Sequence, residues 1–200
     1  MEQAAQIIPE FQNPLNNKER WKGYPFRNIA LSHFVGMSGV ERRRTEVAAK
    51  LPRKDPRAGI FGYKEVMRLK DVTDGASNTI AIIGAGELAG PWASGGGATI
   101  RGARKPHFGG ISGFGTEGND TEGAVALRAD GSSKFISAEI DPKVFEAMCT
   151  AHGKESVDLE THWEEAPQIA EDKVKKFRRT VIDGNSDEDD EPNESHRRRR

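Results

Sequence analysis

The segment Ile80–Ala89 (IAIIGAGELA) comes closest to a known chemical site. Its apolar run and its G-x-G-x-x-A spacing are those of a dinucleotide-binding turn, where glycines let a pyrophosphate approach the N-terminus of a helix. That chemistry needs a helix after the glycines, and the following Gly90-Pro91-Trp92 and its glycine run stop a helix within one turn. The segment therefore predicts a buried strand that enters a loop. A nucleotide-using enzyme is kept as a rival hypothesis.

The other side chains with catalytic potential are isolated in the sequence. The five histidines have no metal-ligand spacing, and the single cysteine, Cys149, excludes an internal disulfide. Cys149 lies on the apolar stripe of a predicted helix, which favours a buried structural thiol over a nucleophile. His33 lies in an apolar segment, which favours a packed or surface histidine over a ligand. We therefore predict a protein that is not an enzyme and that has no resident cofactor.

Acidic residues gather in one glycine-rich loop, at Glu117, Asp120 and Glu122. Oxygen ligands on a flexible loop are what Ca²⁺ prefers, so these three residues are weak metal candidates. Their spacing does not match a calcium-binding helix-loop-helix, and a solvated loop is the preferred interpretation. A Ca²⁺-binding or small-ligand-binding domain is therefore kept as the alternative function.

Charge and hydropathy limit the partners of the chain. The 30 basic and 31 acidic residues leave a net charge of -1, so no global field attracts nucleic acid. The basic runs Arg42–Arg44 and Arg197–Arg200 have acidic neighbours, which favours solvated charge. No apolar run suits a signal peptide or a membrane-spanning helix, so we expect no membrane insertion by the chain as written. Its location stays open, and so does the presence of an anchor upstream of Met1.

Residue patterns predict an α+β fold, mainly an antiparallel β-sheet with hairpins and glycine-rich loops and with a C-terminal helix packed on it. Strands are expected at 28–37, 59–63, 66–69 and 79–83, and a hairpin joins 124–128 to 134–137 around Asp130-Gly131. Asp141 and Pro142 begin a helix that Gly153 ends, and a second helix is expected at 168–180. The expected organisation is an irregular lead-in (1–30), a β-rich domain (31–155), a helical extension (156–182) and a disordered acidic and basic tail (183–200).

Nine landmarks in fixed order resemble the C-terminal domain of the prepilin-like family called domain of unknown function 1559. They are Ser32-His33-Phe34-Val35-Gly36, Arg57–Tyr63, Asp71–Thr79 (DVTDGASNT), Gly90-Pro91-Trp92, Ala129-Asp130-Gly131-Ser132, Phe135-Ile136-Ser137, Ile140–Phe145, Thr150 and Gly153-Lys154-Glu155. The resemblance implies a non-catalytic β-sheet module associated with the envelope, a type II secretion system or pseudopilins. The structural motif would comprise Asp74, Gly75, Ser77, Asn78, Asp130, Gly131, Asp141 and Pro142, with the Asp-Gly pairs serving backbone geometry.

Two departures from that family limit what the resemblance implies. Family members separate a histidine from the Asp-Gly pair by nine residues, and that position here is Asp120. His107 is the alternative counterpart if residues 111–123 are an insertion, and the ungapped alignment with Asp120 is preferred. The N-terminal prepilin helix is also missing, so fibre assembly through that helix is not inferred.

The predicted function is a structural or interaction module that binds a protein partner or assembles with itself. Its glycine-rich loops, 90–97 and 109–123, would form the contact surface, with Trp92 and Phe114 as apolar contacts. The alternative is that both rings fold onto their own sheet.

Overall fold

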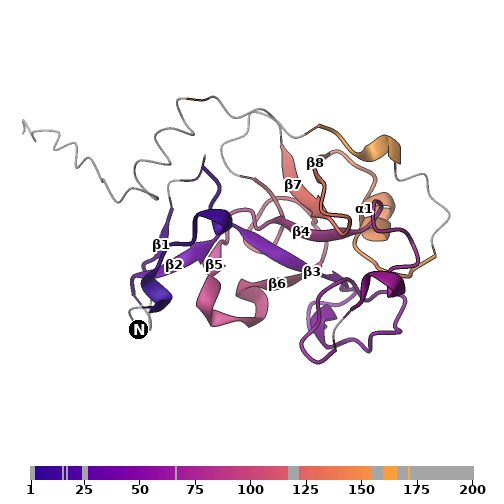
Figure 1. The fold of residues 1–200 in the computed structure, drawn as a ribbon, viewed down its shortest axis with the longest axis horizontal. Helices are drawn as coiled ribbons and strands as arrows, with labels where there is room; N and C mark the ends of the chain where they lie inside the picture. The colour runs from indigo at the N-terminus through magenta and orange to yellow at the C-terminus, as the bar shows by residue number, and fades with distance from the viewer. Residues whose placement is uncertain are drawn as a thin grey trace, which may run out of the picture. The chain divides into compact units, whose positions relative to one another are not determined.

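The computed structural model describes residues 3–14, 16, 18–23, 27–65, 67–116, 122–154, 160–165 and 171. Residues 1–168 form one compact unit, and residue 171 is the only described position of the second, 169–200. The first unit is an α+β fold made mainly of antiparallel strands, as predicted (Figure 1). Its strands are β1 (Arg20–Trp21), β2 (Ile29–Ser32), β3 (Phe34–Val40), β4 (Ile80–Gly84), β5 (Gly90–Pro91), β6 (Ile100–Ala103), β7 (Gly123–Arg128) and β8 (Ser133–Ser137).

Helical structure among the described residues is short. The α-helix α1 spans Pro142–Met148. Single 3₁₀ turns lie at Gln3–Ala5, Pro9–Phe11, Ala48–Lys50, Leu69–Asp71, Trp92–Ser94, Gly96–Ala98 and Glu160–His162. No helix in this part of the chain has the length and apolar character needed to cross a bilayer.

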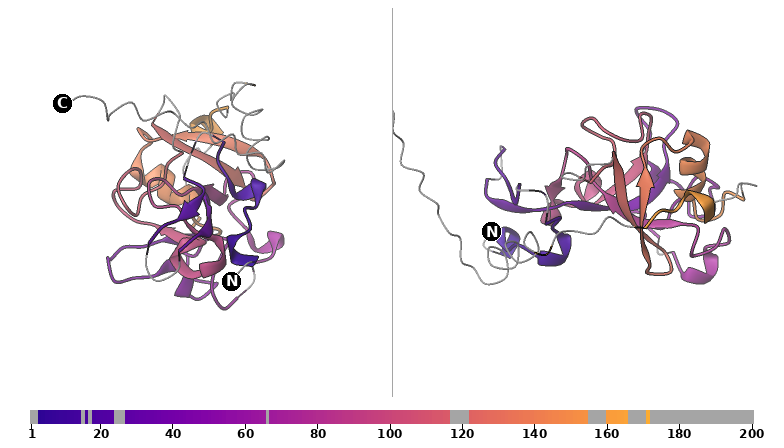
Figure 2. Two further views of the ribbon diagram at one scale, coloured as in Figure 1. Left: turned by 90° about the vertical axis from the view of Figure 1, so that its left-hand side faces the viewer. Right: turned by 90° about the horizontal axis from the view of Figure 1, so that it is seen from above.

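The main sheet has five strands in the order β6-β3-β4-β7-β8. All neighbours are antiparallel except β3 and β6, which run parallel, so both of these strands end at the same edge. A smaller sheet, β1-β2-β5, lies at the other end of the unit from α1 (Figure 2). β2 and β3 are nearly continuous, and the break between them at His33 divides the single strand predicted for 28–37.

One face of the main sheet carries the core. Its buried side chains come from β3, β4, β7 and β8 and from α1, where Phe145 and Met148 are fully buried. Phe114 and Phe145 lie 5.8 Å apart between ring centroids, so the 108–115 loop packs against the helix. Cys149 is buried here, as predicted, and burial raises the pKa of its thiol well above the ordinary value.

His33 fastens the N-terminal segment to the sheet. Its Nδ1 accepts from the Asn13 amide at 2.7 Å, and its Nε2 donates to the Lys18 carbonyl at 2.8 Å. The His33 amide also donates to the Phe11 carbonyl at 2.8 Å. The prediction of a packed histidine is therefore confirmed, and its hydrogen bonds hold Phe11, Asn13 and Lys18 beside the sheet.

The local predictions with explicit turn and cap chemistry are confirmed. β7 and β8 form the antiparallel hairpin, with Gly131 at φ +89° in its turn. The Asp141 carboxylate accepts from the Lys143 and Val144 amides, and Pro142 opens α1. The end of the helix was predicted wrongly: α1 stops at Met148 rather than at Gly153.

Two predicted strands are absent from the described residues. Residues 59–63 form no strand and follow a single bridge between Gly39 and Ala58. Residues 67–69 lead into a 3₁₀ turn instead of a strand. The 57–61 chain still lies beside β3, because the Val40 amide donates to the Arg57 carbonyl and the Phe61 amide donates to the Met37 carbonyl, each at 2.9 Å. Gly39 allows this close approach, since a β-carbon there would lie 1.9 Å from the Arg57 carbonyl oxygen. The helix and tail predicted beyond residue 167 lie outside the described residues, apart from residue 171.

Candidate functional site

The face of the main sheet opposite the core carries half-buried apolar side chains. Along β7 the small Ala124 and Ala126 point into the core, and the larger Val125 and Leu127 alternate to the other face. The neighbouring strands add Phe34, Ile82 and Ile100 to this face. Apolar surface that a sheet normally covers thus stays in contact with solvent.

Aromatic rings from outside the sheet form walls around this floor. Phe61 lies over Gly36, where a β-carbon would come within 2.8 Å of the ring, so glycine lets the ring approach the strand. Phe11 and Phe61 are each 38% exposed. The Trp92 indole Nε1 donates to the Gln6 carbonyl at 3.0 Å, which ties this wall to the N-terminal segment.

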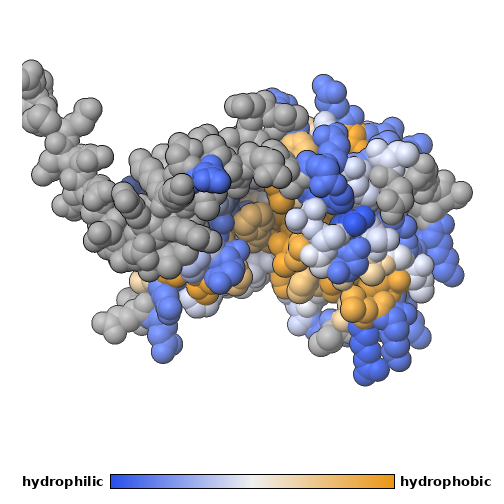
Figure 3. Space-filling model, turned by 45° about the horizontal axis from the view of Figure 1, so that its top comes forward, coloured by the Kyte–Doolittle hydropathy of each residue, from blue (hydrophilic) through white to orange (hydrophobic). Residues whose placement is uncertain are grey.

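We call this depression, about 760 Å³ in volume, the sheet groove. Its floor is Phe34, Ile82, Ile100, Val125 and Leu127, and its walls are Phe11, Phe61 and Trp92. Glu10 is the only charged residue among the described residues of its lining, so the groove offers mainly apolar contact. Exposed apolar side chains gather near the centre of the view in Figure 3.

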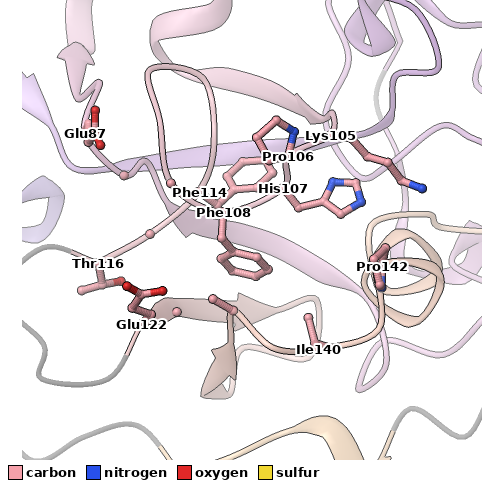
Figure 4. Close-up of a pocket in the computed structure, with 15 residues that line it drawn as sticks. Glu87, Lys105, Pro106, His107, Phe108, Phe114, Thr116, Glu122, Ile140 and Pro142 are labelled. Carbon is pink, nitrogen blue, oxygen red and sulfur yellow. The ribbon is translucent and has the colours of Figure 1, made fainter.

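A second cavity, of about 640 Å³, lies beside the core (Figure 4). His107 is 93% buried there, since 7% of its surface is exposed, and its ring lies 5.1 Å from that of Phe145. Its Nε2 is 3.2 Å from the Glu146 carboxylate, within ion-pair range. Burial lowers the pKa of His107, and the Glu146 carboxylate opposes that shift. Burial at this position therefore favours the neutral imidazole.

Among the other polar side chains that line this cavity, Lys105 lies near His107, and both lie within ion-pair range of the Glu146 carboxylate, at 3.6 Å and 3.2 Å. Figure 4 shows Glu87, Thr116 and Glu122 at the side away from the imidazole. The Thr116 hydroxyl accepts from the Val125 amide at 2.8 Å, which engages it in the fold. Among the described residues that line the cavity, no hydroxyl or thiol lies beside His107.

The predicted motif residues hold turns together instead of forming a site. The Asp74 carboxylate accepts from the Gly153 amide at 2.7 Å and from the Lys154 amide at 3.2 Å. Asn78 donates to the Asp74 carbonyl at 3.1 Å, and Gly75 has φ +98°. The 71–79 turn therefore clamps the segment that follows α1.

The two Asp-Gly turns also contact each other. The Asp130 amide donates to the Ala76 carbonyl at 3.1 Å, and Arg128 Nη1 donates to the Ser77 carbonyl at 2.9 Å. The Asp130 carboxylate accepts from the amide and the hydroxyl of Ser132, and these bonds lower its pKa. Motifs about 50 residues apart in sequence thus form one hydrogen-bonded corner.

The two aromatic residues predicted as surface contacts lie in different environments. Phe114 is 1% exposed and belongs to the core, so its prediction as a surface contact is wrong, and the alternative of a ring folded onto its own sheet holds. The Phe114 amide donates to the His107 carbonyl at 2.7 Å, and the preceding Gly113 packs against the Gly109 carbonyl, where a β-carbon would come within 2.0 Å. Trp92 is half-buried and forms a wall of the sheet groove.

The metal candidates are only partly described. Glu117 and Asp120 lie outside the described residues, and Glu122 is exposed at the rim of the His107 cavity. Within the described ranges, no three His, Cys, Asp or Glu side chains gather where they could hold a metal ion. The choice between Asp120 and His107 as counterpart of the family histidine stays a prediction.

The dinucleotide pattern leads into a loop, as predicted. Gly86 follows β4 in a turn with φ +66°, and no helix occurs between Ala85 and Pro91. Arg101 fills the space behind this turn, because its guanidinium donates to the carbonyls of Ala85, Leu88 and Gly113. The glycine turn is thus closed by the protein's own side chain.

Sequence reasoning missed the sheet groove. The usable signal was the segment 123–128 (GAVALR), where both alternating sets are apolar, a pattern typical of a strand covered on both faces. The contributions of Phe11 and Phe61 carry no local signal, because they depend on loops that return to the sheet.

Comparison with known proteins adds no relative to this description. No family model, no curated protein and no solved structure matches the chain. Fold and site together define an α+β domain with an open apolar groove.

Proposed function

We propose that this protein is a non-catalytic interaction module that binds an amphipathic helix of a protein partner in the sheet groove. The observation that carries the proposal is the half-buried apolar floor formed by β3, β4, β6 and β7 on the face opposite α1. Covering that surface stabilises a complex by the hydrophobic effect, about 25 cal/mol per Å² of apolar area.

The shape of the groove favours a helix over other occupants. A sheet face is covered by helices or by a second sheet. Phe61 lies over Gly36, and Phe11 and Trp92 also line the groove, so aromatic rings are available to contact the apolar side of a helix. Glu10 on the lining complements a basic residue at the polar boundary of such a helix.

The proposal is tested with a labelled amphipathic helical peptide that carries leucines at i, i+3, i+4 and i+7, titrated into the full chain by fluorescence anisotropy. The variant Phe11→Ser/Phe61→Ser should weaken binding by about tenfold or more, because two exposed rings are lost from the walls. The matched control is Leu69→Ser/Ile111→Ser, which removes side chains that are 67% and 74% exposed outside the groove.

Equal affinity of both double variants for the peptide would refute the groove as the binding site. Saturable binding of a fatty acid without binding of the peptide would replace the helix by a small apolar ligand. Unchanged thermal unfolding of the variants shows that any loss is one of contact and not of folding.

The resemblance to the prepilin-like family supports an envelope, type II secretion or pseudopilin setting for this module. The Ca²⁺-binding alternative rests on Glu122 together with Glu117 and Asp120. A melting shift with Ca²⁺ that disappears in Asp120→Ala would favour that alternative.

A further inference from the structure

The parallel pairing of β3 and β6 brings together basic residues that are far apart in sequence. Val40 and Ala103 are partners at the ends of the two strands, and the Glu41 amide donates to the Ala103 carbonyl at 2.8 Å. The chain continues from β3 into Arg42–Arg44 and from β6 into Arg104 and Lys105. Both basic segments therefore leave the same edge of the sheet.

These segments enclose a cavity of about 310 Å³. Five basic side chains line it, Arg42, Arg43, Arg44, Arg104 and Lys105, together with the two carboxylates of Glu41 and Glu146. The basic charge at this edge therefore exceeds the acidic charge, although the whole chain has a net charge of -1. We call this the basic pocket.

The carboxylates near the basic pocket are already engaged. Glu41 is 9% exposed, accepts from the Ala48 amide at 3.1 Å and pairs with Arg104 at 3.1 Å. Glu146 lies 3.6 Å from the Lys105 ammonium and 3.2 Å from His107.

Glu46, which the sequence places beside the arginine run, is turned elsewhere. One of its carboxylate oxygens pairs with Arg57 at 2.5 Å, and the other accepts from the backbone amide of Arg42. No ion pair within the described ranges involves the guanidinium groups of Arg42, Arg43 or Arg44. Arg42, Arg43 and Arg44 are all exposed, which agrees with the prediction of solvated charge.

We propose that the basic pocket binds a compact, multiply charged phosphate group. A guanidinium group donates two parallel N–H bonds to the oxygens of a phosphate. Several guanidinium groups around one small cavity supply more positive charge than a ligand with a single carboxylate would need. Val40 is the only apolar residue of the lining, and no aromatic ring lies there to stack on a base. That composition fits a pyrophosphate-like group or a phospholipid headgroup and disfavours a nucleotide or a single-stranded nucleic acid.

The site is tested by calorimetric titration of the full chain with inorganic pyrophosphate in low-salt buffer. The variant Arg42→Gln/Arg44→Gln should weaken binding by about tenfold or more, because two charge-assisted contacts are lost. The control Lys22→Gln/Arg27→Gln removes the same charge from exposed positions outside the pocket and should bind as the wild type does.

A second arm separates the sources of phosphate, with vesicles of phosphatidylcholine that contain phosphatidic acid. Vesicle binding lost in the pocket variant and kept in the control assigns the site to a lipid headgroup. Pyrophosphate binding without vesicle binding assigns it to a soluble ligand. The proposal is overturned if the wild type binds neither probe, if the two variants lose affinity equally, or if citrate binds as tightly as pyrophosphate.

Discussion

Replacement of Arg101 should destabilise the fold more than any change to an exposed arginine. The side chain is 8% exposed, and burial lowers the pKa of its guanidinium. It faces no carboxylate among its described contacts and instead donates to three carbonyls, of Ala85 at 2.7 Å, Leu88 at 2.8 Å and Gly113 at 3.2 Å. The loops at 85–88 and 113–115, which also share the backbone hydrogen bond from the Gly86 amide to the Gly115 carbonyl at 3.0 Å, therefore meet at one cation.

The magnitude follows from the groups that would lose their partner. In Arg101→Met the three carbonyls stay buried without a donor, and each unsatisfied group costs about 1 kcal/mol or more. Removing the guanidinium also removes the cost of burying its charge, which offsets part of that loss. We expect a net loss of about 3 kcal/mol in the free energy of unfolding. Arg101→Lys should lose about half as much, because an ammonium donates to fewer of the carbonyls.

Urea denaturation followed by tryptophan fluorescence measures the effect. The control is Arg53→Met, which removes a half-exposed pair with Asp71 and should cost at most about 1 kcal/mol. Equal loss in Arg101→Met and Arg53→Met, with unchanged dependence on urea, would show that water satisfies the three carbonyls. Amide exchange in residues 85–90 and 113–115 should accelerate in Arg101→Met and not in the control.

Three further outcomes are expected. Asp74→Ala should lower the free energy of unfolding by about 1–2 kcal/mol in urea titrations, because two amides lose a carboxylate acceptor, and Glu139→Gln should change it little. Burial lowers the pKa of His107 below its ordinary 6.5, so the unfolded chain binds the proton more tightly, and stability should fall as pH drops below 6.5 in the wild type but less in His107→Phe. Burial raises the pKa of the Glu41 carboxyl above its ordinary 4.5, so the contribution of this carboxyl to stability declines as pH rises through that value. Glu41→Gln should therefore gain stability relative to the wild type between acidic and neutral pH. Parallel curves of unfolding free energy against pH, in either the His107 or the Glu41 comparison, would contradict the assigned burial.

Sequence patterns predicted the elements whose signals are local. The β7–β8 hairpin follows from Asp130-Gly131, and the start of α1 follows from Asp141-Pro142, because turn and cap chemistry act within a few residues. The strand β4 follows from a β-branched apolar run. These elements account for three of the five strands of the main sheet.

The rest depends on contacts that no local pattern encodes. Strand β6 (IRGA) contains an arginine, and the burial of Arg101 beside β3 depends on three carbonyls from distant loops that accept from its guanidinium. Phe114 lies in a glycine-rich loop that suggests exposure, and it becomes a core residue because the loop turns toward α1. The basic pocket forms where the ends of β3 and β6 meet, and a long stretch of chain separates these two strands in the sequence.

The long chain segment between β3 and β6 should also affect the order in which the strands pair during folding. β7 and β8 are joined by a tight turn and need little loop-closure entropy, whereas β3 and β6 can pair only after the whole intervening chain has been placed. We expect the hairpin to be protected first and β6 last in pulsed hydrogen exchange during refolding. Since β6 contributes to both the groove floor and the basic pocket, a chain arrested before that final step would have a stable hairpin and neither binding surface.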